Sequence, residues 1–491
     1  MFEEKKAEWL RIAESLKPTL RREIVRPVSG MPDHALAENE SFVLDFGNHF
    51  VGHLTLKLSS KGSHPDAPAW LAVKFCENSR ELNESLDEYR GWISKGWVQT
   101  EEAHVDVLPA LLSLPRRYAF RYVKIEVLAL SNKYRLTIED ACAQTQTSAR
   151  DDAVSPYRGG AEDEKIDRVA LRTLRSCMQS VFEDGPKRDR RLWLGDLRLQ
   201  ALANYATYRN NNLVKRCLYL FAGVANDEGR MPACLFLEPK VEADDTFMFD
   251  YALFFIPVLL EYLRQTNDCE TARELLPTAL RQLELSENQF DGDLVRDSDR
   301  LGWCFVDWNL NLNKQASAQA IWLYCAKAML ALCDRLGSAR PDGLEAAIRL
   351  RAETMRRAWF DPAQGVFVSG AERQVSWASQ VWAVLAGVVE GADAANCLDA
   401  VKGLPGALGM VTPYMMHHYI EALCLVGPKK EALDAMRGYW GAMVDRGADT
   451  FWELFNPDNP EESPYGSSVV NSYCHAWSCT PTWYLRSGIL T

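Results

Sequence analysis

The spacing of apolar residues changes near residue 150, from alternation to a helical period. Before that point, short runs of alternating apolar and polar residues lie between clusters of glycine, proline, serine and asparagine, which is typical of strands joined by turns. The runs begin at Ser41, His53, Ala69, Tyr118 and Tyr134, and they predict an antiparallel β-sandwich over residues 31–150. A short helix over residues 3–17 is predicted ahead of it, within a lead-in of residues 1–30.

Beyond a polar linker over residues 144–160, apolar residues recur at spacings of three and four, as on one face of a helix. Several predicted connections are short enough to join antiparallel neighbours. We therefore expect a mainly α domain over residues 151–491, in which six helical pairs could close into a ring. The predicted helices cover residues 161–182, 197–210, 213–225, 249–266, 269–288, 314–337, 342–358, 376–390, 394–403, 413–426, 428–445 and 475–487.

Composition and charge narrow the class of protein. The 491 residues exceed the usual size of one hydrophobic core, which favours two domains. The net charge of −12 argues against a nucleic-acid partner. The N-terminus is too charged for a signal peptide, and the longest apolar run, over residues 251–260, is far below the roughly 20 residues that span a bilayer. We expect a cytoplasmic protein without a membrane partner.

Cysteine usage bears on the redox state and on metal binding. The 13 cysteines are scattered through predicted core helices and form no CxxC pair. This pattern favours reduced thiols in the core over a disulfide framework or a zinc site. We expect neither a metal nor a cofactor.

The densest group of candidate functional residues lies at 184–196, between two predicted helices. It contains Asp184, Asp189, Trp193 and Asp196, and Asp196 would suit the N-cap of the next helix. One interpretation is a solvated charged loop with a basic patch. The other is a sugar site, because carboxylates hydrogen-bond hydroxyl groups, one acid can donate a proton, and tryptophan covers the apolar face of a pyranose. The spacing of the acids around the tryptophan favours the sugar site.

The order Asp-x-Pro-x-Arg-Asp, then a tryptophan and Gly-Asp, resembles the signature of the α-L-rhamnosidases of glycoside hydrolase family 78. The resemblance implies that Asp189 is the general acid and that Asp184 and Asp196 bind the sugar. Many members have Glu where this chain has Asp189, Cys where it has Gly185 and Thr where it has Leu194. Short members similar to this chain carry the Lys-Arg-Asp-Arg form, so the shorter acid is interpreted as a subfamily trait.

Hydrolysis of a glycosidic bond usually takes a second acid. The best candidate is Glu453, in the run Gly-Ala-Asp-Thr-Phe-Trp-Glu that starts at Gly447. A glutamate beside a tryptophan is more often surface packing, but this run resembles the family motif whose glutamate is the general base. The resemblance also places a sugar-binding histidine at His475, although a lone histidine would otherwise be a cap or a core residue.

Other candidates come from segments near predicted helix starts. Trp303, Asp307 and Trp308 resemble the segment in which the family presents a substrate-stacking tryptophan, and Asp250 is either an N-cap or a sugar ligand. Trp377, Tyr414, His417 and His418 could line the same cleft; the two histidines have no third ligand at metal spacing. The predicted substrate-binding residues are Asp184, Arg188, Trp193, Asp196, Asp250, Trp303, Asp307, Trp308 and His475.

The arginines of the motif complicate the assignment of the acid. Arg188, Arg190 and Arg191 would lower the pKa of Asp189 if they touched it. We therefore expect their guanidinium groups to point away from Asp189 and to pair with other acids.

The resemblance implies an (α/α)6 barrel preceded by a β-sandwich. The sandwich could be a binding module, a dimer surface or a brace, and a brace is favoured. The predicted activity is that of an inverting exo-α-L-rhamnosidase acting on a rhamnose-containing small glycoside or oligosaccharide, with a homodimer implied by resemblance to short members. The alternatives are another (α/α)6 enzyme, such as an unsaturated uronide hydrolase or a lyase, and a non-catalytic sugar-binding protein. The predicted acids should lie roughly 6.5–9.5 Å apart, to leave room for the attacking water.

Overall fold

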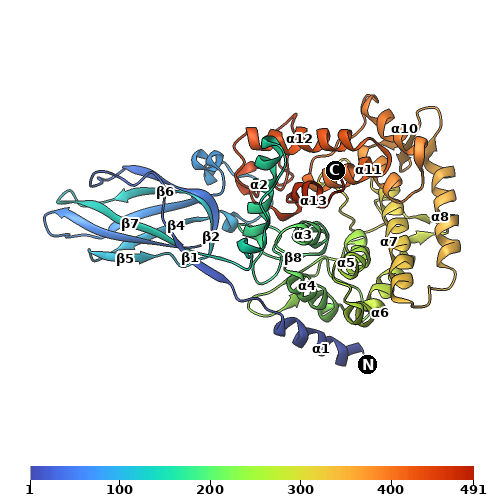
Figure 1. Cartoon of the computed structure of the whole chain (residues 1–491). Coiled ribbons are helices and arrows are strands. Elements are labelled where there is room, and N and C mark those ends of the chain that lie inside the picture. Colours follow the sequence, from blue (N-terminus) through green and yellow to red (C-terminus); the bar gives the residue numbers. More distant parts are fainter. Residues whose placement is uncertain (1, 491) are drawn as a thin grey trace.

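The computed structural model describes residues 2–490, apart from the side chains of residues 2–4 and of residue 88. Figure 1 shows an elongated antiparallel sheet beside a larger helical body. The strands of the sheet are β1 (Arg21–Val25), β2 (Ser41–Gly62), β3 (Ala69–Cys76), β4 (Thr100–Val105), β5 (Ala110–Ser113), β6 (Tyr118–Ala129) and β7 (Tyr134–Thr147). The prediction of an antiparallel strand domain followed by a helical domain is confirmed.

Hydrogen bonds join the seven strands in the order β1-β7-β2-β6-β3-β4, with β5 paired to β2. Alternate side chains point to one face, where Leu44, Leu56, Val73, Val123 and Leu136 are fully buried. These apolar residues form a core separate from that of the helical domain. The alternation that predicted the strands therefore records which face of the sheet is buried.

The runs that begin at Ser41 and His53 were predicted as two strands, but they form the single strand β2. The register of β2 against β6 shifts between Asp45 and Phe50, which marks a bulge. Gly47 lies inside the bulge with φ +77°, and its N–H donates to Asp45 Oδ1 at 2.7 Å. The glycine thus bends the strand without ending it.

The helical domain contains α2 to α13, and each predicted helix has a counterpart. Three boundaries differ by five residues or more: α2 ends at Cys177 rather than residue 182, α9 ends at Leu385 rather than residue 390, and the last helix begins at Pro481 rather than residue 475, since a proline suits the first helical position. The helices are α1 (Phe2–Ser15), α2 (Ala161–Cys177), α3 (Leu194–Ala206), α4 (Asn211–Val224), α5 (Phe249–Thr266), α6 (Cys269–Ser286), α7 (Gln315–Leu336), α8 (Leu344–Trp359), α9 (Trp377–Leu385), α10 (Gly391–Lys402), α11 (Pro413–Val426), α12 (Lys429–Asp445) and α13 (Pro481–Arg486).

Contacts between helices run in a circuit. Helix α3 contacts α5, α5 contacts α7, α7 contacts α9, and α9 contacts α11. The short turn η7 (Ala476–Ser478) contacts both α11 and α3, and so completes the circuit. Helix α7 is long and apolar enough to cross a membrane, but 72% of its most apolar window is buried inside the protein. It is thus a core helix of the circuit.

In the described part of the chain, short strands in the loops between the helices form three small sheets. They are β8 (Leu192–Trp193), β9 (Cys234–Phe236) and β10 (Glu242–Ala243) in one sheet, β11 (Phe290–Asp291) with β12 (Leu294–Val295), and β13 (Phe360–Asp361), β14 (Val366–Ser369) and β15 (Gln374–Val375) in another.

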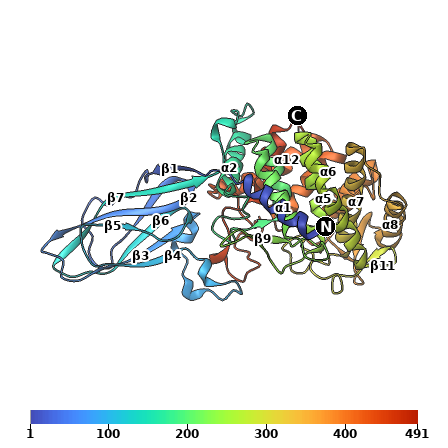
Figure 2. The ribbon, with the colours of Figure 1, turned by 90° about the horizontal axis from the view of Figure 1, so that it is seen from below.

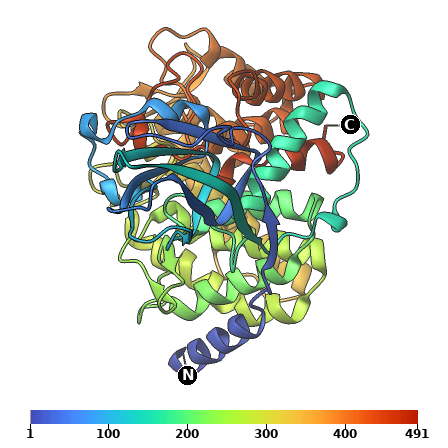
Figure 3. The same ribbon diagram turned by 90° about the vertical axis from the view of Figure 1, so that its left-hand side faces the viewer.

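The first helix belongs spatially to the helical domain. Figure 3 shows α1 beside the green helices, and α1 contacts α4. Trp9 is buried, and its Nε1 donates to Glu274 at 2.7 Å. The chain therefore starts on the helical domain, crosses to the sheet and returns through β7 and α2.

Candidate active site

The segment 184–196 is a loop shaped largely by the Asp184 carboxylate. One Asp184 oxygen accepts from Arg191 N at 3.0 Å, and the other accepts from Asp189 N at 3.3 Å. Arg190 N donates to Gly185 O at 3.1 Å, which closes a turn within the loop. Asp184 therefore fixes the backbone on which Asp189 is carried. The N-cap of α3 is Trp193 rather than Asp196, which lies in the first turn of that helix.

A cavity of about 370 Å³ opens above this loop. Its inner wall contains Asp184, Asp196 and His475, each at most 4% exposed, whereas Trp303 at its mouth is 53% exposed. Polar groups therefore form the inner wall, and an aromatic ring stands at the rim. Of the predicted residues, the lining brings together Asp184, Arg188, Asp189, Trp193, Asp196, Trp303, Trp308, Glu453 and His475.

Arg188 connects the two predicted catalytic acids. Its Nη1 lies 3.5 Å from Asp189 Oδ1, and its Nη2 forms an ion pair with Glu453 Oε2. The Tyr465 hydroxyl donates to the other oxygen of Glu453, and the guanidinium lies 4.3 Å from the centre of the Tyr465 ring. The expectation that Arg188 points away from Asp189 is wrong, because this buried cation takes both acids as partners.

Of the two neighbouring arginines, Arg191 meets the expectation of pairing with another acid, because it pairs with Asp244 at 3.0 Å. Arg190 departs from it, since its Nε donates instead to a backbone carbonyl, Lys187 O, at 3.3 Å. The positive charge nearest Asp189 therefore comes mainly from Arg188.

Burial raises the pKa values of the three aspartates in the loop. The pKa of Asp184 rises to about 8, first through burial and then through the charge of Asp189. Burial, and then the charge of Asp184, raises the pKa of Asp196 well above its usual range. Burial also raises the pKa of Asp189 and outweighs the opposing charges of Arg188 and Arg191. The protonated form that a general acid requires is thus favoured at Asp189.

His475 lies between two of these acids. Its Nδ1 is 3.5 Å from Asp196 Oδ1, and its Nε2 is 3.9 Å from Asp184 Oδ2. Burial and the charge of Arg188 lower the pKa of His475 well below its usual value, so the ring is neutral. Within residues 2–490, neither His475 Nδ1 nor Asp196 Oδ1 has a hydrogen-bond partner, although both are buried. Leaving such atoms unpaired is costly, and a ligand rich in hydroxyl groups would satisfy them.

Aromatic rings form much of the remaining wall. Trp193 meets Tyr251 edge to face at 6.2 Å, and Phe305 lies between Trp308 at 5.2 Å and Trp477 at 5.5 Å. The Nε1 atoms of Trp193 and Trp308 are buried and have no partner in the part of the chain that the structure describes. These indoles offer both a ring face and a hydrogen-bond donor to a ligand.

Asp250 and Asp307 are not in the cavity lining. The Asp250 carboxylate accepts from the N–H groups of Phe305 and Val306, both at 3.0 Å. Asp307 accepts from Val411 N at 3.0 Å and from the Thr412 hydroxyl at 2.6 Å. Their acceptor atoms hold loops together, so the structure gives them a supporting position rather than the predicted contact with the sugar. The lining also omits Trp377, Tyr414, His417 and His418.

Several lining residues were not predicted from the sequence. Tyr465 lies in a stretch without helical or strand periodicity, and Trp92 and Trp97 come from the segment between β3 and β4, far from the helical domain in sequence. The high number of tryptophans, 15 in the chain, was the available signal. It indicated an aromatic cleft without saying which rings form it. The other unpredicted residues are Ile93, Ser94, Arg191, Thr246, Met248, Tyr251, Phe305 and Trp477.

The sheet domain supports the loop through Lys187. The Lys187 side chain is only 3% exposed, and its Nζ lies 2.6 Å from Glu81 and 3.7 Å from Glu77. Both glutamates follow β3, and Lys187 Nζ also donates to Asn471 O at 2.6 Å. These ion pairs tie the sheet domain to the residue that precedes Arg188, as expected of a brace.

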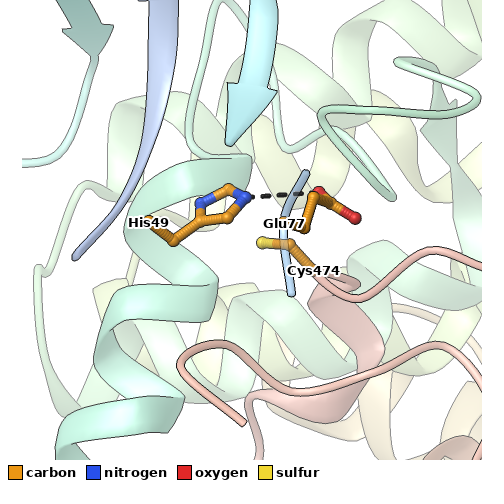
Figure 4. A group of neighbouring side chains, drawn as sticks. All are labelled: His49, Glu77 and Cys474. Atoms are coloured by element: carbon orange, nitrogen blue, oxygen red, sulfur yellow. Dashed lines mark hydrogen bonds and ion pairs between the residues drawn. The ribbon is translucent and has the colours of Figure 1, made fainter. Parts of the chain in front are cut away.

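A second junction lies beside the first and joins both domains (Figure 4). His49 of β2 binds Glu77 through Nε2 at 3.2 Å and Ser176 of α2 through Nδ1 at 2.9 Å. The other oxygen of Glu77 accepts from Tyr473 N at 2.8 Å, next to Cys474. The polar atoms of His49 and Glu77 are thus used to hold the segment that leads to His475.

Comparison with known proteins agrees with this geometry. The family model described as the glycosyl hydrolase family 78 alpha-rhamnosidase N-terminal domain matches residues 14–145. The one described as the bacterial alpha-L-rhamnosidase 6 hairpin glycosidase domain matches residues 162–489. None of the curated proteins compared with this chain matches it.

Solved structures show the same relationship. The chain is similar to a rhamnosidase from Klebsiella oxytoca with rhamnose bound, at 46% identity over 98% of each chain and a TM-score of 0.95. A family 78 rhamnosidase of Bacillus sp. GL1 shares the fold, at 22% identity over 93% of this chain and 47% of the other, with a TM-score of 0.76. The chain therefore belongs to the α-L-rhamnosidases of glycoside hydrolase family 78.

Proposed function

We propose that this protein is an inverting exo-α-L-rhamnosidase, which hydrolyses terminal α-L-rhamnose from small glycosides or oligosaccharides. The observation that carries the proposal is that Asp189 and Glu453 line one cavity and contact one guanidinium group, that of Arg188. The related Klebsiella oxytoca rhamnosidase was solved with rhamnose bound. This supports a rhamnoside over the uronide substrates of other helical-barrel enzymes and over a protein that only binds sugar.

The proposed reaction is a single displacement at the anomeric carbon, in which the two acids act in the same step. Asp189 donates its proton to the glycosidic oxygen as the bond from that oxygen to the anomeric carbon breaks. Glu453 takes a proton from a water molecule whose oxygen forms the new bond on the opposite face. The sugar leaves with inverted configuration, and a further proton exchange restores the two acids.

The inner wall suits a single terminal sugar. Asp184, Asp196 and His475 present polar atoms to ring hydroxyl groups, and two of those atoms lack partners among the described residues. Apolar side chains of Met248 and Phe305 line the same cavity and suit the methyl group that rhamnose carries. Because the acids of this wall are buried, a chain end fits better than the middle of a polysaccharide.

The proposal also includes the type of fold, the oligomeric state and the cellular location. The circuit from α3 through α11 and η7 supports an (α/α)6 barrel over residues 151–491, with a sandwich-type domain over residues 31–150 after the lead-in of residues 1–30. A cytoplasmic homodimer remains part of the proposal.

The function is tested by turnover of rhamnosides by the purified protein and its Asp189→Asn variant. On an alkyl rhamnoside, kcat should fall by roughly 10²–10⁴, the usual contribution of a general acid. An activated nitrophenyl rhamnoside should suffer much less, because its leaving group needs little protonation. The matched control is Asp106→Asn, which removes an exposed carboxylate outside the cavity. Equal activity of Asp189→Asn and the parent on the alkyl substrate would refute the assignment.

Stereochemistry tests the partner acid separately. Proton NMR of the first-formed sugar should show the β anomer, and Glu453→Gln should lose activity on both alkyl and nitrophenyl substrates. An initial α anomer would show retention and would remove Glu453 from the role of general base.

A further inference from the structure

The mouth of the cavity is built partly by the sheet domain. Trp92, Ile93, Ser94 and Trp97, from the segment between β3 and β4, line the same cavity as the catalytic acids. Figure 2 shows this light-blue segment beside the red loop that precedes α13. Trp92 is 69% exposed, although it lies against a formed cavity. An exposed indole at such a position is a ready surface for a ligand.

Trp92 is held in place despite its exposure. Its Nε1 donates to Pro464 O at 3.1 Å, and its ring centre lies 5.6 Å from that of Tyr465. The chain approaches Tyr465 closely at Gly91, where any side chain would collide with the Tyr465 carbonyl oxygen. The hydroxyl of Tyr465 in turn donates to Glu453. The indole is therefore positioned with respect to the general base, unlike a freely rotating surface tryptophan.

The sugar and the leaving group of a bound glycoside would lie at different depths in the cavity. Asp184 and Asp196 lie at the inner wall with side chains 5% and 3% exposed, while the Asp189 side chain is 20% exposed. If the sugar occupies the inner wall and the glycosidic oxygen faces Asp189, the leaving group must extend outward. The groups that it meets there include Trp92, Ile93, Ser94, Trp97 and Trp303, which carry no charge. Arg191 also lines the cavity, but its guanidinium pairs with Asp244.

We propose that Trp92, with Trp97 and Trp303, forms the subsite for the leaving group and selects rhamnosides whose leaving group presents a flat, apolar ring face. Aromatic aglycones fit this chemistry best, and a second sugar offers it through the apolar face of its ring. The inference rests on the proposed rhamnosidase activity and adds the substrate class. It also gives the sheet domain a direct part in substrate selection.

The experiment compares kcat/KM of the full-length protein and Trp92→Ala on three substrates. These are a two-ring aryl rhamnoside such as the methylumbelliferyl compound, a rhamnosyl-glucose disaccharide, and methyl α-L-rhamnoside. Loss of one stacked ring should lower kcat/KM for the aryl substrate about tenfold, mainly through KM, with a change of about twofold or less for the methyl substrate. Trp92→Phe should recover most of the aryl activity.

The matched control is Trp70→Ala. Trp70 belongs to β3 of the same domain and has its Nε1 bound to Glu102 at 3.1 Å, but it lies outside the cavity. All three values should stay within about twofold of the parent for this variant.

The substrates separate the possible outcomes. A fall on both ring-bearing substrates supports a general ring subsite, and a fall on the aryl substrate alone supports aromatic aglycones. An unchanged aryl value, or an equal fall on all three substrates, overturns the proposal. If the parent hydrolyses none of the rhamnosides, the proposed function itself fails, and this outcome is distinct from an active parent that is insensitive to Trp92→Ala.

Discussion

Replacing Lys187 by methionine should show how strongly the sheet domain stabilises the loop that carries Asp189. Methionine keeps an unbranched side chain of similar length and removes the charge together with the N–H donors to Glu81 and Asn471 O. Burial lowers the pKa of Lys187, but the charges of Glu81 and Glu77 outweigh this effect and raise it overall. Lys187 is therefore a buried cation whose acidic partners belong to the other domain.

The size of the effect follows from what remains after the change. Without the ammonium group, Glu81 and Glu77 stay close together with side chains at most 6% exposed. Breaking such a buried pair costs about 3–5 kcal/mol. The matched surface pair is Lys57 with Glu139, at 2.8 Å and with side chains 56% and 37% exposed, where Lys57→Met should cost much less because water screens both charges.

Urea unfolding followed by tryptophan fluorescence measures both variants against the parent. Adding Glu81→Gln to Lys187→Met should recover part of the lost free energy, because one of the uncompensated charges is then removed. A loss for Lys187→Met no larger than that for Lys57→Met would refute the reasoning. So would a double variant less stable than Lys187→Met alone.

Two further predictions concern the acids. Burial raises the pKa of Asp189, so kcat/KM on an alkyl rhamnoside should fall only as the pH rises through a value above the ordinary aspartate range of about 4. This high-pH limb of the rate profile reports Asp189 and Asp184 together, because the two carboxyl groups interact. Arg188→Met should move this limb to higher pH, because the arginine lowers the pKa of Asp189; a shift to lower pH would contradict the assignment. Asp250→Asn should lower the free energy of unfolding by about 1–3 kcal/mol, because the carboxylate accepts hydrogen bonds from Phe305 N and Val306 N, and it should leave KM for rhamnosides unchanged. A higher KM at unchanged stability would instead indicate that Asp250 binds the sugar.

The elements were predictable because each buries one face. Alternation identified the strands, and the three-and-four spacing identified the helices, since both patterns record contact with a core. Two of the boundaries that failed depended on single residues instead. Gly47 continued β2 through a bulge where a turn was expected, and Pro481 began a helix that the apolar pattern had started earlier. No periodicity carries that information.

The inner wall was largely predictable and the rim was not. Asp184, Asp189 and Asp196 fall within one short loop, so local sequence indicated them together. The role of Arg188 depended on Glu453, which lies 265 positions away in sequence, and the expectation failed because that contact is created by folding. Asp250 failed for a different reason: its carboxylate could bind a sugar hydroxyl, but in the fold it accepts hydrogen bonds from backbone N–H groups instead.

The sheet domain reaches the candidate active site by two routes that differ in physical character. One is electrostatic and internal: Glu77 and Glu81 hold Lys187, whose neighbour Arg188 contacts both proposed catalytic acids. The other is apolar and exposed, with Trp92 at the mouth of the cavity. The first is a property of the folded protein at rest, whereas the second matters only when a leaving group is present. A helical domain without the sheet would therefore lack both the partners of Lys187 and part of the outer wall, so the site belongs to the two domains jointly.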